Sequence, residues 1–491
     1  MPDFPMIGHF KDVGAFRAHV ARLGIDLPAD NSILSAVQGS PLAQPLDIGG
    51  FRVGNRWCIQ PMEGWDGTTQ GEPTDNTRRR WRHFGASGAK LIWGGEAFAV
   101  QADARGNPNQ LALIDGNEAS AERSLASVLD ALLDAHRQSI GPTDELLVGL
   151  QLTHSGRFCR PNDSFRAEPR IAYHHPLLDE RFGIDPRDDS CIVSDDYLDR
   201  LIEAFIACAR IARRVGFHFV DVKHCHGYLG HELLSAFTRR GRFGGSFENR
   251  TRFARETVQG IKATCPGLMI GVRLSAFDSP PFAQHPASSN GRGVPADYAS
   301  HLPYRYAFGC RPEEPLSLDL SEPAAFIDML GGLGVRLLNI SCGSPYYNPH
   351  IQRPAMYPPS DGYDPPEDPL IGVARQIDVV RRLRQRCPGA ILIGSAYSYL
   401  QEYLPHVAQA VVRNGWTDFV GIGRLALSYW DLPADTLAGR PLEKRRLCRT
   451  FSDCTTAPRN GLMSGCYPLD VHYKTSPDAR RLEVKKRQGA R

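Results

Sequence analysis

A lysine, three histidines and a tyrosine gather in the short stretch VKHCHGYLGHELL, residues 222–234, which ends in an apolar run with helical spacing. Two histidines two residues apart at the end of a strand, here His224 and His226, are what a metal-dependent barrel hydrolase would use. A lysine, a histidine and a tyrosine that face a bound ligand would instead transfer protons. The stretch therefore indicates a metal site, a proton-transfer site or a polar strand end.

The composition is that of a globular chain without a strong electrostatic bias. The 491 residues are 42% hydrophobic, and the formal net charge at pH 7 is +3. Because Lys and Arg nearly balance Asp and Glu, we expect no nucleic-acid partner and no membrane partner. No window approaches the roughly 20 apolar residues that a membrane span needs, and the N-terminus does not read as a secretory leader. We expect a soluble, cytoplasmic protein.

Helical and strand-like patterns alternate from about residue 55 to residue 425. The clearest unit begins at Ser194, a good N-cap, and continues as a helix to Gly216, after which FHFVDV reads as a strand. Eight strand candidates separated by helices favour an α/β fold of the (β/α)8 barrel type over an open doubly wound sheet. No GxGxxG follows a first strand, which weakens the open-sheet alternative further.

Three segments lie outside this alternation. We expect residues 1–45 to form an N-terminal extension, residues 46–435 the barrel, and residues 436–491 a C-terminal tail. Residues 277–315 follow the fifth strand and are rich in Pro, Ser, Gly and aromatic residues. Because barrel enzymes place their chemistry at the C-terminal ends of the strands, this long loop is the expected lid.

Side-chain alternation along three neighbouring strands directs polar groups into the barrel. The outward set of a barrel strand must be apolar because helices cover it. This rule points Gln151, Lys223 and Arg273 inward. Buried without partners they would each cost several kcal/mol, so we expect a polar ligand among them, with a self-paired, water-filled barrel end as the alternative. By the same rule His224 leaves the interior, and His226 reaches the mouth only if the chain turns, which disfavours a shared metal.

The last two strand candidates, ILIGSAYS and FVGIGRL, each end in small or basic residues. These are Gly394, Ser395 and Ala396 after the first strand, and Gly423 and Arg424 after the second. Small residues let backbone N–H groups approach an anion, and an arginine can bind it bidentately. Glycines at strand ends are also ordinary turns, but together with the inward polar groups they predict a phosphorylated cofactor across the barrel mouth.

Several motifs, in their order along the chain, resemble those of the old yellow enzyme family of FMN oxidoreductases. HCHGYLGHELL followed by RRGRFGGSFENRTRF resembles the family's HxxHGYL strand end and YGGSxENRxRF loop. QLTHSGR, NRWCIQPM, VRLS and GIGR resemble its QLxHxGR, NRxxxxPM, VRxS and phosphate-binding strands. The resemblance covers roughly residues 45–430. It implies a (β/α)8 barrel that binds FMN without a covalent bond.

The resemblance also implies roles for single positions. Gln151 would hydrogen-bond the pyrimidine edge of the flavin, and Arg273 would stabilise negative charge near N1 of its reduced form. Residues 394–396, with Gly423 and Arg424, would hold the phosphate. The positions along the flavin ring would be Pro61, Met62, Glu63 and Ala97.

Three further positions would act on the substrate. Tyr228 matches the family's proton donor, which protonates one carbon of an activated double bond while flavin N5 delivers hydride to the other; an aromatic packing role is the alternative. His226 and Lys223 match the pair that grips the substrate's electron-withdrawing carbonyl. The family usually has histidine where this chain has Lys223, so a carboxylate or other anionic acceptor is expected. Glu63 stands where many members have Thr or Cys, and a carboxylate facing the ring would disfavour the anionic reduced flavin.

Cysteines in the tail raise the question of an iron–sulfur cluster. Larger relatives, which resemble dienoyl-CoA reductases, follow the barrel with C-x2-C-x3-C-x11-C and an FAD/NAD(P)H domain. Here Cys448, Cys454 and Cys466 keep only the last spacing and lack a fourth cysteine. We expect a lost cluster, with a zinc site completed by His472 or a disulfide as alternatives. Hydride would then come from diffusible NAD(P)H, a partner reductase or the substrate.

These observations favour an FMN-dependent oxidoreductase that reduces an activated C=C bond with NAD(P)H. Within the flavin class, the alternative is oxidation or demethylation of an amine, or dehydrogenation of an acid. Outside that reaction class, the alternatives are a metal-dependent hydrolase that uses His224 and His226, and a catalytically idle flavin-binding barrel. The expected partners are a small-molecule substrate, in addition to a partner reductase or further copies of the chain.

Overall fold

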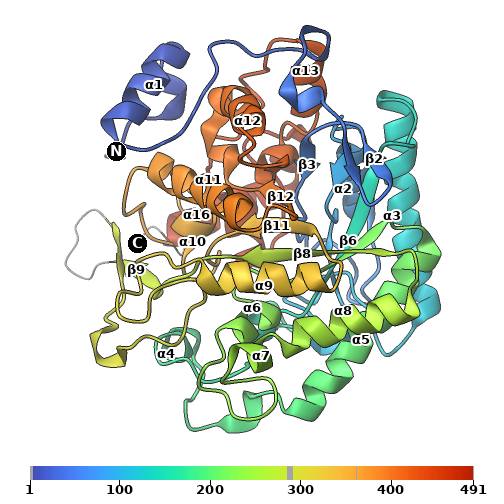
Figure 1. Ribbon diagram of the computed structural model, residues 1–491, viewed down its shortest axis with the longest axis vertical. Coiled ribbons are helices and arrows are strands. Elements are labelled where there is room, and N and C mark those ends of the chain that lie inside the picture. The colour runs from blue at the N-terminus through green and yellow to red at the C-terminus, as the bar shows by residue number, and fades with distance from the viewer. Residues whose placement is uncertain (1–3, 285–290, 361, 490–491) are drawn as a thin grey trace.

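A closed ring of eight parallel strands, surrounded by helices, forms the centre of the protein in this computed structural model, which describes residues 4–284, 291–360 and 362–489 (Figure 1). The strand β3 pairs with β4 and with β13, and a β4–β6 pairing completes the ring. The predicted (β/α)8 barrel is confirmed. Its strands are β3 (Trp57–Ile59), β4 (Leu91–Ile92), β6 (Leu147–Thr153), β7 (Phe219–Val222), β8 (Met269–Ser275), β11 (Leu337–Ser341), β12 (Ile391–Gly394) and β13 (Phe419–Ile422), with β5 (Ala97–Ala99) added beside β6.

The helix predicted between Ser194 and Gly216 is present as α5 (Asp195–Val215). In α5, Ser194 accepts a hydrogen bond from the backbone N–H of Tyr197, and Gly216 ends the helix with φ of +104°. A left-handed residue of this kind is unstrained only when it is glycine. The covering helices are α2 (Asp75–Gly85), α3 (Glu118–Ser139), α5 (Asp195–Val215), α8 (Arg252–Thr264), α9 (Ser321–Gly332), α11 (Pro369–Arg386) and α12 (Leu404–Arg413).

The barrel interior is layered from apolar to polar along its axis. At the N-terminal end, Trp93, Phe219 and Phe419 pack together, and the hairpin of β1 (Leu46–Ile48) and β2 (Phe51–Val53) adds Ile48 and Val53 to this cluster. Above it lies a layer of buried polar side chains that includes Gln60, Gln151, Asp221 and Asn339. The hydrophobic end therefore supports a polar floor beneath the barrel mouth.

The N-terminal extension packs against the outside of the barrel. Its helix α1 (Val13–Arg22) lies near α12 at the upper left of Figure 1, and Phe16 stacks on Tyr403 with ring centroids 4.6 Å apart. Asp30 accepts hydrogen bonds from Arg413 and from Gln409 Nε2, the latter at 2.7 Å. These contacts tie the extension to α12.

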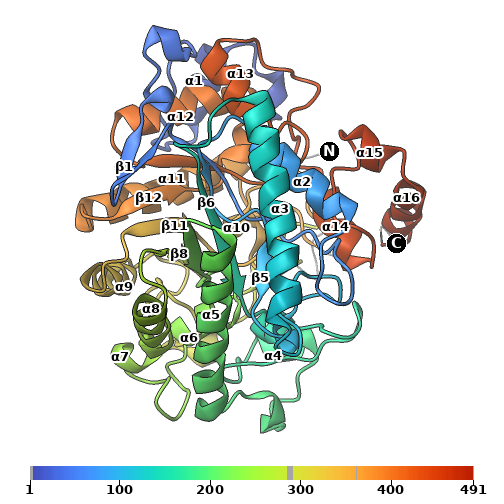
Figure 2. The same cartoon turned by 90° about the vertical axis from the view of Figure 1, so that its right-hand side faces the viewer.

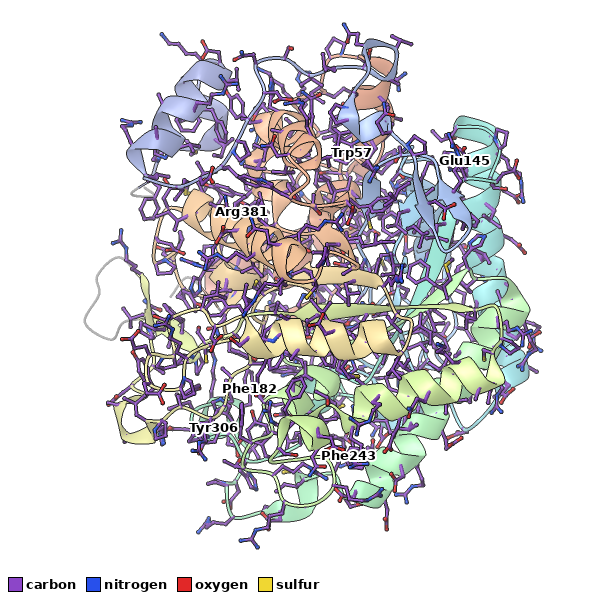
Figure 3. All side chains as sticks on the ribbon, in the orientation of Figure 1. Trp57, Glu145, Phe182, Phe243, Tyr306 and Arg381 are labelled. Atoms are coloured by element: carbon purple, nitrogen blue, oxygen red, sulfur yellow. The ribbon has the colours of Figure 1, made fainter. Side chains whose placement is uncertain are left out.

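The long loop after β8 contains the short hairpin of β9 (Phe282–Gln284) and β10 (Gly293–Pro295). Residues 285–290 lie outside the described residues. Tyr304 and Tyr306 pack against His175, with ring centroids 6.2 and 5.3 Å away. In Figure 3, Tyr306 and Phe182 of α4 (Leu178–Phe182) lie in the lower half of the view, whereas Trp57 lies in the upper half.

The C-terminal tail folds back beside α2. Its helices α14 (Asp453–Arg459), α15 (Val471–Lys474) and α16 (Pro477–Gly489) gather on one side of the barrel in Figure 2, after α13 (Leu432–Ala438). Both terminal nitrogens of Arg79 in α2 donate to Asp470, at 2.8 and 2.9 Å. Nowhere in the described part of the chain is a helix long and apolar enough to cross a bilayer.

Candidate active site

A cavity of about 190 Å³, open to solvent, lies at the C-terminal ends of the barrel strands. Pockets in barrel enzymes occur at this face because the loops that follow all eight strands converge there. The cavity brings together most of the residues selected from the sequence. These are Pro61, Met62, Glu63, Gln151, Lys223, His226, Tyr228, Arg273, Ser395, Ala396, Gly423 and Arg424.

Two of the selected residues do not line the cavity. Ala97 lies fully buried in β5, where its carbonyl accepts a hydrogen bond from Gln110 Nε2 at 2.8 Å. Gly394 ends β12, and its carbonyl accepts from Gln60 Nε2 at 3.4 Å. Ala97 therefore supports the strand edge rather than the cavity wall.

Asp221 organises the polar floor of the cavity. Its carboxylate accepts hydrogen bonds from Gln151 Nε2 at 2.6 Å, from Trp93 Nε1 at 2.7 Å and from the backbone N–H of Arg273 at 2.7 Å. Burial raises the pKa of Asp221, and these three donors oppose that shift. Asp221 thereby fixes the orientation of the Gln151 amide. Gln151 and Arg273 both point inward, as predicted, because both line the cavity.

A cluster around Glu63 lies across the mouth from β3 to β7. Lys223 Nζ donates to Glu63 Oε1 at 2.6 Å, and the phenol of Tyr228 donates to Glu63 Oε2 at 2.7 Å. Lys223 Nζ also lies 3.7 Å from the centre of the Tyr228 ring, and Tyr346 OH lies 3.0 Å from Tyr228 OH. Burial raises the pKa of Tyr228 well above its ordinary value, and the Glu63 charge adds to this shift. Tyr228 is therefore a neutral phenol near pH 7.

The loop that carries Glu63 is anchored by a buried ion-pair network. Glu96 accepts a hydrogen bond from the backbone N–H of Gly64 at 2.8 Å. Arg80 joins Glu96 to Asp66, and the side chains of all three are at most 5% exposed. Burial raises the pKa of Glu96 to about 7, although Arg80 opposes the shift. Because the network holds residues 64–66, it fixes the point from which Glu63 projects.

His226 and His224 point in different directions. His226 has φ of +67°, the turn that the sequence required for it to reach the mouth, and its Nε2 lies 3.0 Å from Ser341 Oγ. Burial, followed by Arg273 and Lys223, lowers the pKa of His226 well below its ordinary value, so the imidazole is neutral. The His224 ring packs near Phe326 outside the barrel.

A shared metal is therefore not supported. No group of three or more His, Cys, Asp and Glu side chains is placed to hold a metal ion within residues 4–284, 291–360 and 362–489.

One end of the cavity is strongly cationic. Among the described residues, the cavity is lined by five cationic side chains and by a single carboxylate, that of Glu63. Three of the cations, Arg353, Arg424 and Arg459, lie near one another. Arg424 donates to Thr455 Oγ1 and Arg353 donates to Ser452 Oγ, while Nη1 of Arg353 is buried without a hydrogen-bond partner in the described part of the protein. Burial lowers the pKa of Arg424 to about 10, and the nearby Arg353 charge adds to this effect. This end is built for an anion.

Several lining residues were not found from the sequence. Tyr346 and Arg353 come from the segment after β11, and residues 454–464 of the tail form part of the wall. Neither segment carries a motif or a strand parity that would indicate its position. The described residues of loop 277–315 do not line the cavity in this structure, and the role of the loop as a lid stays a prediction. Instead Tyr346, stacked on Phe158 at 3.9 Å, stands at the mouth.

Comparison with known proteins decides the family. Residues 41–285 match the NADH:flavin oxidoreductase / NADH oxidase family. The chain belongs to this family. It is 29% identical over 249 residues to an NADPH dehydrogenase of Geobacillus sp. (strain WCH70), an alignment that covers 49% of this chain and 64% of that enzyme, and so less than two thirds of the relative's length.

Two further likenesses extend over more of the chain. An NADH:flavin oxidoreductase of Gibberella zeae is 23% identical over 401 residues, which cover 77% of this chain and 81% of the relative. A 2-naphthoyl-CoA reductase structure superposes with a TM-score of 0.62 and 17% identity, and covers 88% of this chain and 57% of that one. The likeness to the 2-naphthoyl-CoA reductase structure shows a shared fold.

The residues of the cavity fit FMN, the cofactor of this family. Arg353 and Arg424 supply charge for a phosphate, and the unpaired Nη1 of Arg353 is a donor that such a group would satisfy. Ser395 and Gly423 follow β12 and β13, where barrels bind phosphate. Gln151 and Arg273 line the same cavity and present polar groups of the kind that bind a flavin ring.

The tail cysteines form no disulfide and hold no assigned metal. All twelve cysteines are free. Cys448 and Cys466 are buried, and Cys454 lies at the cavity wall. His472 Nε2 lies 2.7 Å from Asn76 Oδ1. The disulfide alternative is therefore wrong, and the loss of the cluster stays a prediction.

Proposed function

We propose that this FMN-dependent oxidoreductase reduces an activated C=C bond with electrons from NAD(P)H. The observation that carries the proposal is a buried neutral phenol, Tyr228, in a cavity that also contains His226, Arg273 and an anion-binding end. When bound, FMN supplies the hydride. The chain itself must hold the substrate, exclude water and deliver one proton.

Tyr228 delivers that proton. The carbon that becomes basic during reduction is a far stronger base than a phenolate, so a phenol with a raised pKa still protonates it. Lys223 Nζ, 3.7 Å from the ring centre, stabilises the negative charge that Tyr228 acquires. Tyr346, 3.0 Å away and half-buried, provides a route by which the phenol regains a proton.

His226 positions the electron-withdrawing group of the substrate. Its lowered pKa keeps the imidazole neutral. His226 Nε2 lies 3.0 Å from Ser341 Oγ. A substrate oxygen at the mouth would replace Ser341 as the hydrogen-bond partner of His226. A polarised C=C bond is thereby held beside Tyr228.

A second candidate function is dehydrogenation, favoured by one contact. Tyr228 donates a hydrogen bond to Glu63, which leaves its oxygen as an acceptor, with Tyr346 OH 3.0 Å away. A phenol in this state can take a proton from a saturated acid or an amine while its own proton passes to Glu63. The same cavity therefore also suits removal of a proton and a hydride.

An anaerobic absorbance titration tests the proposal. The purified protein is titrated with NADH and then with NADPH while the flavin band near its visible maximum is followed. Bleaching by either nucleotide, reversed by an unsaturated acid or ketone, is the expected result. A yellow protein that neither nucleotide bleaches, but that a saturated acid or an amine does, favours the second candidate. A protein that binds no flavin even when FMN is added contradicts both.

A further inference from the structure

The Glu63 carboxylate occupies a binding position that resembles one for a substrate. Its two oxygens receive different donors, Oε1 the Lys223 ammonium at 2.6 Å and Oε2 the Tyr228 phenol at 2.7 Å. Lys223 and Tyr228 lie in the segment that follows β7, whereas Glu63 reaches them from the loop after β3. In the strand order β3 and β7 are separated by β4 and β6, so Glu63 crosses the mouth.

The charges around this contact show why it forms. The Lys223 side chain is 4% exposed, and an ammonium buried to this degree needs a counter-charge. Glu63 is the one carboxylate among the described residues that line the cavity, so no other acid there can take its place. The Glu63 side chain is 14% exposed and therefore lies at the solvent side of the pair. Its carboxylate can therefore turn toward the solvent, and water can fill the position that it leaves.

We propose that Lys223 and Tyr228 form a carboxylate-binding subsite, and that Glu63 fills it until a substrate carboxylate displaces it. The ligand class is a small organic acid whose carboxylate receives the same two hydrogen bonds. Glu63 is then an internal competitor. The identity of this acid as the substrate rests on the proposed function. The existence of the binding subsite rests on the three side chains alone.

Displacement has two physical consequences. A free carboxylate competes with a tethered one, so the apparent affinity is reduced by the fraction of time that the subsite is open. The substrate carboxylate also replaces Glu63 as the acceptor of the Tyr228 hydrogen bond. Acids that cannot reach both donors, and neutral amides, gain nothing from this exchange.

The test is calorimetric titration of the FMN-loaded protein with benzoate, and with benzamide as the neutral isostere. We expect Glu63→Ala to bind benzoate at least about 10-fold more tightly than the wild type, because the internal competitor is gone and Lys223 has lost its counter-charge. The affinity for benzamide should not change. Glu63→Gln, which keeps the side-chain size, should show a smaller gain of the same sign and covers the case in which the alanine variant folds poorly.

Two controls identify the subsite. Adding Lys223→Met to Glu63→Ala should abolish the gain, because the ammonium is the group that the probe meets. Glu145→Ala, which breaks the surface ion pair with Arg52, should leave the benzoate affinity at the wild-type value. A Glu63→Ala protein that binds benzoate no more tightly, that gains equally for benzamide, or that keeps its gain without Lys223 overturns the proposal. Because titration needs no turnover, a protein that lacks reductase activity but shows the gain leaves the subsite standing and rejects only the proposed reaction.

Discussion

Tyr228 owes its chemistry to the two charged groups that touch it. Glu63 accepts its hydrogen bond and its charge raises the pKa of the phenol, whereas the Lys223 ammonium lies against the ring and stabilises the phenolate. The position of the phenol relative to this pair decides whether it acts as an acid or as a base. Substitutions at this site should therefore affect proton transfer and leave the electron transfer from NAD(P)H intact.

We expect Tyr228→Phe to lower the rate of C=C reduction by roughly 10²- to 10⁴-fold, the usual contribution of a positioned general acid. The rate of nucleotide-driven flavin bleaching should stay within about 2-fold of the wild type, because no proton from Tyr228 enters that half-reaction. Stopped-flow measurement of the two half-reactions separates the effects. Equal losses in both would assign Tyr228 a packing role instead.

Strand parity predicted the inward side chains but not their partners. Gln151, Lys223 and Arg273 point inward because their neighbours in the strands must face the helices, and that rule needs only one strand at a time. The Glu63–Lys223 pair joins strands on different sides of the ring, and no local pattern encodes such a contact. An anionic substrate would therefore have to displace Glu63 before it could bind Lys223.

At the scale of elements, the loops after the strands define the cavity more than the strands do. Arg353 enters from the segment after β11, and a guanidinium with an unsatisfied Nη1 is a strong donor for phosphate. Arg424 was predictable because it directly follows β13. Arg353 was not, since eleven residues separate it from the end of β11 at Ser341.

We expect Arg353→Met to weaken FMN binding by roughly 10- to 100-fold, as for the loss of one charge-assisted hydrogen bond, and to leave riboflavin binding unchanged because riboflavin has no phosphate. Quenching of flavin fluorescence on titration of the apoprotein measures both constants. Arg353→Lys should fall between the two proteins, because it keeps the charge but not the fork. A parallel loss for riboflavin would mean that Arg353 acts on the structure of the wall and not on the phosphate.

The buried network of Arg80, Asp66 and Glu96 should make stability depend on pH. The pKa of Glu96 is about 7 in the folded protein against an ordinary value of 4.5, so the folded state keeps a proton that the unfolded chain releases between these values. The free energy of unfolding should therefore fall as the pH rises from about 4.5 to about 7. Urea unfolding of the wild type and of Glu96→Gln at pH 5 and pH 7.5 measures the difference, and the variant should lack this part of the slope. Identical slopes would place the pKa of Glu96 at its ordinary value.

At the scale of the whole molecule, both ends of the described chain return to the barrel. The alternation of helices and strands predicted the barrel, because each unit carries its own periodicity. An amphipathic pattern indicates that a helix has a buried face but not what covers it. For this reason the packing of the N-terminal extension against α12, and of the tail beside α2, could not be read from the sequence.

Because residues 454–464 form part of the cavity wall, the docking of the tail should control how long the cofactor stays bound. Arg79→Ala removes the two hydrogen bonds to Asp470 that hold the tail to α2, and we expect FMN to dissociate roughly 5-fold faster or more. Release can be followed by the rise of flavin fluorescence on dilution. Arg52→Ala, at a surface pair far from the tail, serves as the control. An unchanged release rate would show that the wall stays closed without this contact.

The wall formed by α14 also orders events during synthesis. Of the segments that line the cavity, residues 454–464 leave the ribosome last, after every strand of the barrel has been made. A nascent chain that has completed its eight strands still has an open cationic trough instead of a closed pocket. We therefore expect a polypeptide that terminates shortly after β13 to retain FMN less well than the full chain, because part of its cavity wall is missing.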